Sequence, residues 1–325
     1  MKLGFRDGVL YDEKRSNWDA AGPRPISWSL WYPAADDAQS DVPERSWFQR
    51  AAVARDAPVR PEARPYPLVL LSHGTGGSAA GLEWLARRLV DRRFVALGVS
   101  HHGNTGIEPY RAEGFACLWE RAPDLSYLLD HRDAWLSDLS GDIDTNSVFA
   151  AGFSAGAYSV MLLLGAVAQF SQFEPSRMKP GGARGPREFP DLADHIPALL
   201  RTSDVFRDSW SRMSNSYRDD RIKAALICAP GRSVLGFSEE SLKAVDAPAE
   251  ECSSWLHARL RRSALKIFGG GLGHYVFVPE GTALGLAFAA ELFTDPPGIE
   301  RAVIHEEIAN LSAALFQVSG ISAMA

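Results

Sequence analysis

One serine stands in a setting that favours nucleophilic chemistry. Residues 152–156 read G-F-S-A-G, a G-x-S-x-G motif, and they follow the apolar run 148–150. An apolar, helix-like segment comes next, so the motif has the strand, sharp turn and helix that a nucleophile elbow requires. Glycines let the strand and the helix pass closely, while the turn strains the serine backbone. We therefore predict Ser154 as the nucleophile; the alternative is a chance match in a glycine-rich chain.

A serine of this kind needs a base, and the base needs a third group to hold it. In the elbow setting the order along the chain is serine, acid, histidine. His274 fits this order, because it follows the apolar run 264–268 in the glycine-rich loop G-G-G-L-G-H-Y. The alternative is a structural loop histidine. The other seven histidines lie in helix-like segments, in the 171–216 segment or before the serine: His73, His101, His102, His131, His195, His257 and His305.

A second glycine-rich loop could hold the negative oxygen that forms during attack by Ser154. Residues 73–77 read H-G-T-G-G and follow the buried strand predicted at 67–72. Backbone N–H groups in such a loop can approach a substrate oxygen closely. We predict the N–H of Thr75 and the N–H of Ala155, at the start of the elbow helix, as the oxyanion donors. The alternative for residues 73–77 is a tight glycine turn.

The elements that must position these groups alternate between strand and helix. Continuous apolar runs at 67–72, 94–99 and 222–229 predict strands buried on both faces, and helical spacing predicts helices at 79–91 and 124–139. This alternation predicts an α/β fold with a mainly parallel sheet and helices on both faces. Residues 171–216 break the rhythm with many prolines and glycines, and predict a lid or binding insertion. We expect a single domain over residues 1–325.

Composition excludes several function classes. The net charge of −6 argues against a nucleic-acid or anionic-membrane surface. The N-terminus has no apolar signal region, and the longest apolar run is too short to span a bilayer. Three cysteines show no pairing pattern, and no spacing of metal ligands is present. We therefore predict a cytoplasmic protein with neither a cofactor nor a metal.

The chain resembles the predicted dienelactone-hydrolase-like esterases related to plasma platelet-activating-factor acetylhydrolase, within the α/β-hydrolase superfamily. The resemblance covers most of the chain. It implies a serine carboxylic-ester hydrolase that acts on a small-molecule ester through an acyl-enzyme on Ser154, with His274 as base. True dienelactone hydrolases use a cysteine, so the serine leaves the substrate open. The matching blocks are W-Y-P-A at 31–34, H-H-G-N-T at 101–105, W-E-R at 119–121, D-L-S at 124–126, D-R-I-K-A at 220–224 and G-H-Y-V-F at 273–277, besides 68–77 and 152–156.

The chain departs from that pattern where the third member of the triad should be. Relatives carry a further apolar strand before the histidine loop, ending in a G-x-x-D turn, whereas residues 244–251 read A-V-D-A-P-A-E-E. We therefore expect one sheet strand to be missing. The other position used by relatives, after residues 222–228, holds A-P-G without a carboxylate.

Geometry suggests a replacement for the acid. A helix predicted at 249–262 must run down to the start of the strand at 264–268, which would place residues 246–251 at the catalytic edge. Asp246 is the preferred acid, ahead of Glu251 and Glu250. The alternative is that these carboxylates cap a helix and complement its dipole.

Without an acid, the chain could instead be a catalytically impaired hydrolase-fold protein that binds a ligand or partner. A third interpretation is an acyltransferase that uses the same catalytic groups.

Overall fold

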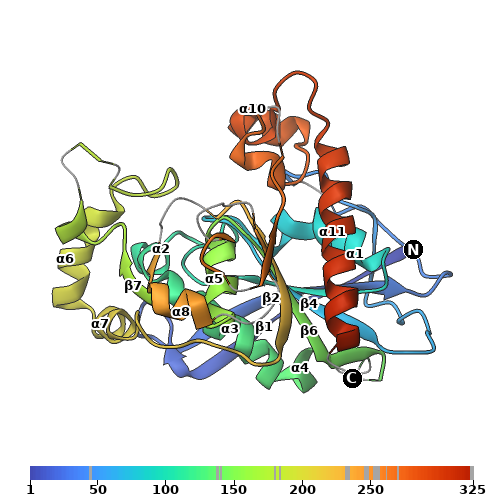
Figure 1. Cartoon of the computed structure of the whole chain (residues 1–325), viewed down its shortest axis with the longest axis horizontal. Helices are drawn as coiled ribbons and strands as arrows, with labels where there is room; N and C mark the ends of the chain where they lie inside the picture. The colour runs from blue at the N-terminus through green and yellow to red at the C-terminus, as the bar shows by residue number, and fades with distance from the viewer. Residues whose placement is uncertain are drawn as a thin grey trace.

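The computed structural model describes residues 1–43, 46–136, 139, 141–178, 181–182, 184–230, 235–244, 249–251, 257–260, 262, 263–268 and 271–322. Within these ranges nine strands form one sheet in the order β11-β10-β8-β6-β4-β5-β2-β1-β3, and two more pair separately (Figure 1). The strands are β1 (Lys2–Ser16), β2 (Pro23–Ala34), β3 (Val53–Arg55), β4 (Tyr66–Ser72), β5 (Val95–Ser100), β6 (Ile143–Phe153), β7 (Ala168–Ser171), β8 (Ile222–Cys228), β9 (Leu235–Phe237), β10 (Ala249–Glu251) and β11 (Ser263–Leu265).

Helices connect and cover these strands. The α-helices are α1 (Glu83–Val90), α2 (Ala112–Ala116), α3 (Arg121–Asp130), α4 (Arg132–Leu136), α5 (Ala155–Leu163), α6 (Leu192–Thr202), α7 (Asp204–Ser211), α8 (Glu239–Ala244), α10 (Ala283–Phe293) and α11 (Arg301–Ser322). Short 3-10 turns are η1 (Ala79–Leu82), η2 (Leu118–Glu120), η4 (Pro175–Arg177) and η5 (His274–Phe277). Among the described residues, none of these helices combines the length and the apolar character that a bilayer crossing demands.

The middle of the sheet is parallel because helical crossovers join its strands. Strands β5, β4, β6, β8, β10 and β11 run parallel, whereas β2 pairs antiparallel with both β5 and β1. Parallel strands bring their carboxyl ends to one edge of the sheet. The residues that follow β4, β5 and β6 therefore meet at that edge.

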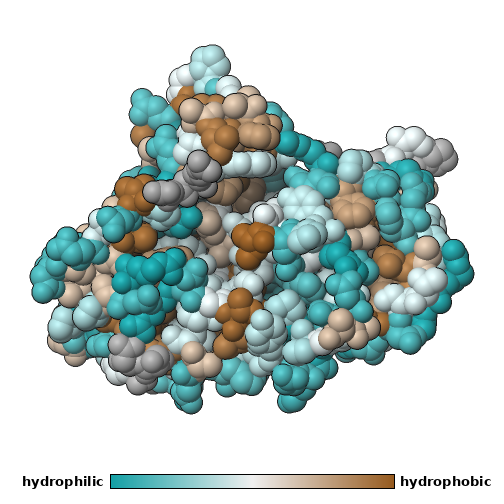
Figure 2. Space-filling view, turned by 180° about the vertical axis from the view of Figure 1, so that it is seen from behind, coloured by the Kyte–Doolittle hydropathy of each residue, from teal (hydrophilic) through white to brown (hydrophobic). Residues whose placement is uncertain are grey.

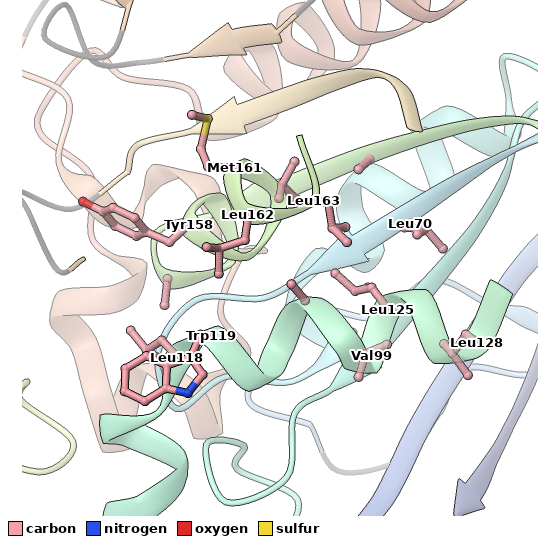
Figure 3. Close-up of a cluster of buried hydrophobic side chains, with 14 of the residues drawn as sticks. Leu70, Val99, Leu118, Trp119, Leu125, Leu128, Tyr158, Met161, Leu162 and Leu163 are labelled. Atoms are coloured by element: carbon pink, nitrogen blue, oxygen red, sulfur yellow. The ribbon is translucent and has the colours of Figure 1, made fainter. Parts of the chain in front are cut away.

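Successive residues of β4 face opposite sides of the sheet and build two cores. Leu68 and Leu70 pack with α3 and α5, in the cluster that Figure 3 shows around Leu125 and Leu162. Val69 and Leu71 pack instead with side chains of α1 and α11 on the opposite face. A strand covered on both faces reads as one continuous apolar run, which is how the sequence predicts it. The mainly parallel, doubly covered sheet predicted from the sequence is confirmed.

The strand expected to be missing is present in shortened form. Ala249–Glu251, named β10, pairs parallel with β8 on one side and with β11 on the other. The helix predicted from residue 249 therefore begins as a strand instead. The prediction failed because a short inner strand needs only its backbone to complete the ladder, and a polar A-E-E sequence carries no apolar pattern.

The inserted segment (residues 171–216) contains more regular structure than its prolines and glycines predict. Helices α6 and α7 follow each other there, and Figure 1 shows them at one end of the molecule. The segment is tied to the core by Trp119, whose indole N–H donates to the Ser209 carbonyl oxygen at 2.9 Å. Trp119 itself is fully buried.

Helix α10 forms an apolar lobe that the sequence pattern did not predict. Leu284, Leu286 and Phe288 are exposed, and the Phe288 ring stacks on Trp47 with centroids 5.5 Å apart. Figure 2 shows apolar surface on this lobe and a hollow beneath it, between the lobe and the body of the molecule.

Candidate active site

Ser154 lies at the sharp turn between β6 and α5. Its backbone has φ 55° and ψ −116°, a positive φ that side-chain-bearing residues rarely adopt. The Ser154 N–H donates to the Cys228 carbonyl oxygen at 3.0 Å, which fastens the turn to the end of β8. The side chain remains partly exposed. The predicted strand, turn and helix are therefore all present at this serine.

Two glycines permit the close passage of backbone at the turn. A Cβ added to Gly152 would lie 2.2 Å from the Gly156 carbonyl oxygen. A Cβ added to Gly156 would lie 1.8 Å from the Ser72 carbonyl oxygen at the end of β4. Any side chain at either position would collide with backbone, so the first and last residues of the G-x-S-x-G motif must be glycine.

His274 meets the serine across the edge of the sheet. Its Nε2 lies 3.0 Å from the Ser154 Oγ, within the distance needed for proton transfer. Its ring packs at a centroid distance of 4.9 Å against Phe153, the last residue of β6. Desolvation lowers the pKa of His274 from its ordinary value, which favours the neutral ring that can accept a proton.

The turn that carries His274 is fastened by helices α1 and α11, which share one core cluster with it. His305 of α11 lies with its Nε2 2.7 Å from the Val276 carbonyl oxygen, and Trp84 of α1 donates to the Phe277 carbonyl oxygen at 2.9 Å. The rings of His305 and Trp84 stack with centroids 3.8 Å apart. These two side chains hold η5 immediately after the histidine, a positioning role that the sequence did not suggest.

The loop after β4 runs directly past the serine. A Cβ added to Gly74 would lie 3.4 Å from the Ser154 Cβ and 3.0 Å from the Phe153 ring. The Thr75 N–H forms no hydrogen bond with the other described residues. The Ala155 N–H is the first of α5, where N–H groups have no partner within the helix. Two candidate donors thus come from elements that meet at Ser154.

Neighbouring side chains hold this loop in place. The Gly76 N–H donates to the Asn104 Oδ1 at 2.7 Å, and the Tyr110 hydroxyl donates to the Gly76 carbonyl oxygen at 2.8 Å. Gly76 itself has φ 66°, a conformation that favours glycine. From the inserted segment, the Glu188 Cγ lies 2.9 Å from where a Gly76 Cβ would be, and burial raises the pKa of the Glu188 carboxyl.

A buried chain of polar groups lies beneath the loop, and sequence reasoning gave it no role. The Ser72 Oγ lies 3.0 Å from the His101 Nε2, and the His101 Nδ1 lies 3.0 Å from the Asp124 Oδ2. The Arg24 guanidinium donates twice to the same carboxylate, at 2.8 and 3.0 Å. Burial lowers the pKa of His101 to about 3, helped by the nearby Arg121. The blocks at 68–77, 101–105 and 124–126, which belong to the family resemblance, include Ser72, His101 and Asp124 but not Arg24.

The acid of the triad stays a prediction. Asp246 lies outside the described residues, and Glu250 and Glu251 are described only by their backbone in β10. Within the described part of the chain, no carboxylate forms a hydrogen bond with His274. The backbone of Glu251 pairs with Ile227, which pairs with Gly152, so this residue lies level with the elbow strand's end. The geometric case for Asp246 assumed a helix from residue 249, and β10 removes that assumption.

A scan against protein-family models and a search of curated proteins found no match to this chain. Solved structures do match. A ferulic acid esterase from Streptomyces cinnamoneus superposes with a TM-score of 0.60 at 19% identity, covering 97% of this chain and 89% of that one. An esterase from Pyrobaculum calidifontis reaches 0.45 at 13% identity, covering 97% and 85%. Est1E from Butyrivibrio proteoclasticus reaches 0.43 at 10% identity, covering 95% and 99%.

These likenesses concern the fold. Of these three, the Streptomyces structure alone is close enough in shape to carry an argument, and at 19% identity it says nothing by itself about substrate or site. Together with the mostly parallel sheet, the doubly covered core and the strand–turn–helix at Ser154, it identifies the architecture. The chain has the α/β-hydrolase fold that its sequence predicts.

Proposed function

We propose that this protein is a serine carboxylic-ester hydrolase that works through an acyl-enzyme on Ser154. The observation that carries the proposal is the 3.0 Å approach of the His274 Nε2 to the Ser154 Oγ at a strained turn. The N–H groups of Thr75 and Ala155 beside that turn, which have no hydrogen-bond partner among the described residues, support it. A nucleophile, a base and an oxyanion site are the parts that acyl transfer needs.

In the proposed reaction His274 takes the proton from the Ser154 Oγ while that oxygen attacks the ester carbonyl carbon. The negative oxygen of the tetrahedral intermediate accepts hydrogen bonds from the Thr75 and Ala155 N–H groups. The protonated His274 then gives its proton to the departing alcohol, leaving the acyl group on the serine. A water molecule, deprotonated by His274, then attacks the acyl carbonyl carbon. The protonated His274 returns the proton to the Ser154 Oγ as the bond from that oxygen to the acyl group breaks and the carboxylic acid leaves.

We propose a small-molecule ester as substrate, in a single domain whose inserted segment (residues 171–216) serves as a lid. The position of Glu188 against the oxyanion loop supports a lid at this place. The finer assignment to the dienelactone-hydrolase-like and platelet-activating-factor-acetylhydrolase-like esterases rests on the sequence blocks. p-Nitrophenyl esters of graded acyl length measure the acyl pocket and so test that finer assignment.

A fluorophosphonate probe tests the nucleophile. We expect the wild type to be labelled and Ser154→Ala to remain unlabelled and inactive on p-nitrophenyl acetate. Absence of labelling in the wild type would overturn the proposal.

For the acid we propose to test Glu251 first, because its backbone ends β10 at the edge where Ser154 lies. Glu251→Gln, Asp246→Asn and Glu250→Gln are compared side by side. Loss of a triad acid lowers turnover by roughly 10⁴-fold. We expect one of the three to show a loss of this order while the others stay near wild type. If all three keep full turnover, none of these carboxylates holds His274.

A second candidate function is ligand or partner binding by a catalytically impaired protein. It is favoured by one observation: no carboxylate among the described residues contacts His274. An unlabelled wild type that still binds p-nitrophenyl ester without turnover would support this candidate. An acyltransferase would instead be labelled, and added alcohols would divert the acyl group from water.

A further inference from the structure

Arg121, the first residue of α3, is a buried charge without an evident structural purpose. Its side chain is 1% exposed, and its Nε and Nη1 atoms have no hydrogen-bond partner among the described residues. Burying a guanidinium that leaves donors unsatisfied is costly. Burial lowers the pKa of Arg121 to about 9. A group kept at such a cost in free energy calls for a function.

Neutralising a buried carboxylate is not that function. The buried acid whose charge acts on Arg121 is Asp124. Asp124 already accepts two hydrogen bonds from Arg24, has the Nη2 of Arg15 at 2.9 Å, and has the Nδ1 of His101 at 3.0 Å. Asp124 would therefore remain fully paired without Arg121. Removing Arg121 would leave no carboxylate buried alone.

The hydrogen bond that Arg121 does make leads to the oxyanion loop. Its Nη2 donates to the His73 carbonyl oxygen, the last backbone acceptor before Gly74. The same nitrogen lies 3.4 Å from the His73 Nδ1. Its positive charge, after burial, lowers the pKa of the His73 ring and so favours the neutral form.

The neutral ring of His73 has one tautomer that satisfies both of its neighbours. The His101 N–H donates to the His73 Nε2 at 3.1 Å, so Nε2 carries no proton. The Nδ1 therefore carries the proton and donates to the Gly74 carbonyl oxygen at 2.6 Å. A protonated ring would lose its acceptor at Nε2, and this arrangement would break.

The Gly74 carbonyl belongs to the peptide unit that presents the Thr75 N–H. In a trans peptide the C=O and the N–H point in opposite directions. Holding the Gly74 oxygen toward the His73 ring therefore turns the Thr75 N–H away from the ring. The Gly77 N–H donates to the same oxygen at 3.2 Å and adds to this hold. A hydrogen bond at the carbonyl also polarises the peptide and strengthens its N–H as a donor.

We propose that Arg121 is a positioning residue for the oxyanion site, acting through His73 on the peptide that carries the Thr75 N–H. The proposal rests on the proposed esterase function. Arg121 is buried and does not contact the substrate. Its role in this proposal is to keep the Thr75 N–H directed at the substrate oxygen. Arg121 is then retained for the alignment of that donor rather than for stability.

The test compares Arg121→Met with Arg121→Lys. Replacing a buried charge by an apolar side chain of similar volume is commonly neutral or stabilising. We therefore expect Arg121→Met to keep or raise the unfolding temperature while kcat falls about 10- to 100-fold and KM stays within about two-fold, since loss of a whole oxyanion donor costs about 10²–10³-fold. Arg121→Lys, which retains a charged donor, should recover part of the lost kcat.

Comparing an oxygen ester with its thionoester gives a ratio of kcat/KM that a purely structural role of Arg121 would leave unchanged. The sulfur of a thionoester is larger than oxygen and accepts hydrogen bonds more weakly, so an aligned oxyanion site favours the oxygen ester. We expect the ratio of kcat/KM for the oxygen ester over the thionoester to fall in Arg121→Met and to recover partly in Arg121→Lys.

The outcomes separate this proposal from the function on which it rests. If the wild type is labelled by fluorophosphonate and turns over ester, yet Arg121→Met keeps the wild-type kcat and ester ratio, the positioning role is wrong and the esterase stands. An Arg121→Met variant that loses stability and activity together, with an unchanged ratio in its folded fraction, assigns Arg121 to folding and also overturns the proposal. A wild type without labelling or turnover overturns both.

Discussion

Ser154 holds a backbone conformation that suits glycine better than serine. Its φ of 55° and ψ of −116° lie in a region where a side chain costs about 1–3 kcal/mol. A glycine there would relieve the strain. It would also increase the conformational entropy of the unfolded chain, which lowers the free energy of unfolding by about 0.4–1 kcal/mol. The strain is larger than the effect on the unfolded chain, so the conformation that exposes the Ser154 hydroxyl lowers the stability of the folded protein.

The first prediction follows from that balance. Ser154→Gly and Ser154→Ala both remove the hydroxyl, but only the alanine keeps the strained Cβ. We expect both variants to be inactive, with the glycine variant about 1 kcal/mol more stable in urea unfolding. An alanine variant about 0.4–1 kcal/mol more stable than the glycine variant would show that the turn is unstrained.

The second prediction concerns the pH dependence of turnover. Only the neutral His274 can accept a proton, and desolvation lowers its pKa from the ordinary value of 6.5. The neutral form therefore persists at lower pH than for a histidine in water. We expect kcat/KM for p-nitrophenyl acetate to fall on acidification with an apparent pKa below 6.5. An acid limb above that value would contradict the prediction and would mean that the carboxylate that holds His274 raises the pKa of the ring by more than desolvation lowers it.

At the scale of elements, the sequence predicts those strands that have an apolar pattern. The strands β4, β5 and β8, and the second half of β6, coincide with continuous apolar runs because each is covered on both faces. The helix predicted over 124–139 is broken into α3 and α4 at His131. The sequence pattern did not indicate the break because the apolar stripe continues across it. Short strand β10 escaped detection because its backbone pairing leaves no trace in an A-E-E sequence.

The candidate site divides in the same way. Ser154, His274 and the loop at Thr75 could be located because each needs glycines at fixed offsets and a preceding strand. The supports of the site could not: His305 and Trp84 reach η5 from helices far away in sequence, and Arg121 reaches His73 across the edge of the sheet. Such contacts depend on tertiary packing and have no local spacing. The acid, which also depends on long-range packing, stays a prediction.

The third prediction tests the support of η5. His305→Ala removes the hydrogen bond to the Val276 carbonyl oxygen and the stacking partner of Trp84. A misplacement of the base by about 1 Å can cost on the order of 10²-fold in rate. We expect kcat to fall by about 10-fold or more and fluorophosphonate labelling of Ser154 to slow. His131→Ala is the control and should leave both unchanged, because this histidine is exposed and its ring bonds, among the described residues, only to the Tyr127 carbonyl oxygen of α3.

At the scale of the whole molecule, three histidines are buried in the neutral form. Burial lowers the pKa of His101 and of His305 to about 3, and places the pKa of His73 well below the ordinary value. Below pH 6.5 the unfolded chain binds protons at these positions and the folded chain does not. The free energy of unfolding must therefore decrease as the pH falls from 6.5.

The fourth prediction gives that decrease a size. Each histidine contributes up to about 1.4 kcal/mol per pH unit between its unfolded and folded pKa values. We expect urea midpoints to be constant from pH 8 to 7 and to drop steeply from pH 6 to 4.5. His305→Asn should reduce the slope by one histidine's share. A flat profile down to pH 5 would contradict the burial of neutral rings at these three positions.

The hydrogen-bond chain from Ser72 through His101 to Asp124 has a consequence for recognising enzymes by shape. A search with a three-residue geometric template would retrieve this set as a complete triad, while Ser154 and His274 would score as an incomplete one among the described residues. The decoy has both contacts at 3.0 Å, yet its serine is 0% exposed and so beyond the reach of any ester. Intact-mass analysis after exhaustive probe treatment should therefore count one adduct per chain. Solvent access, which a distance template omits, distinguishes a reactive serine from a structural one.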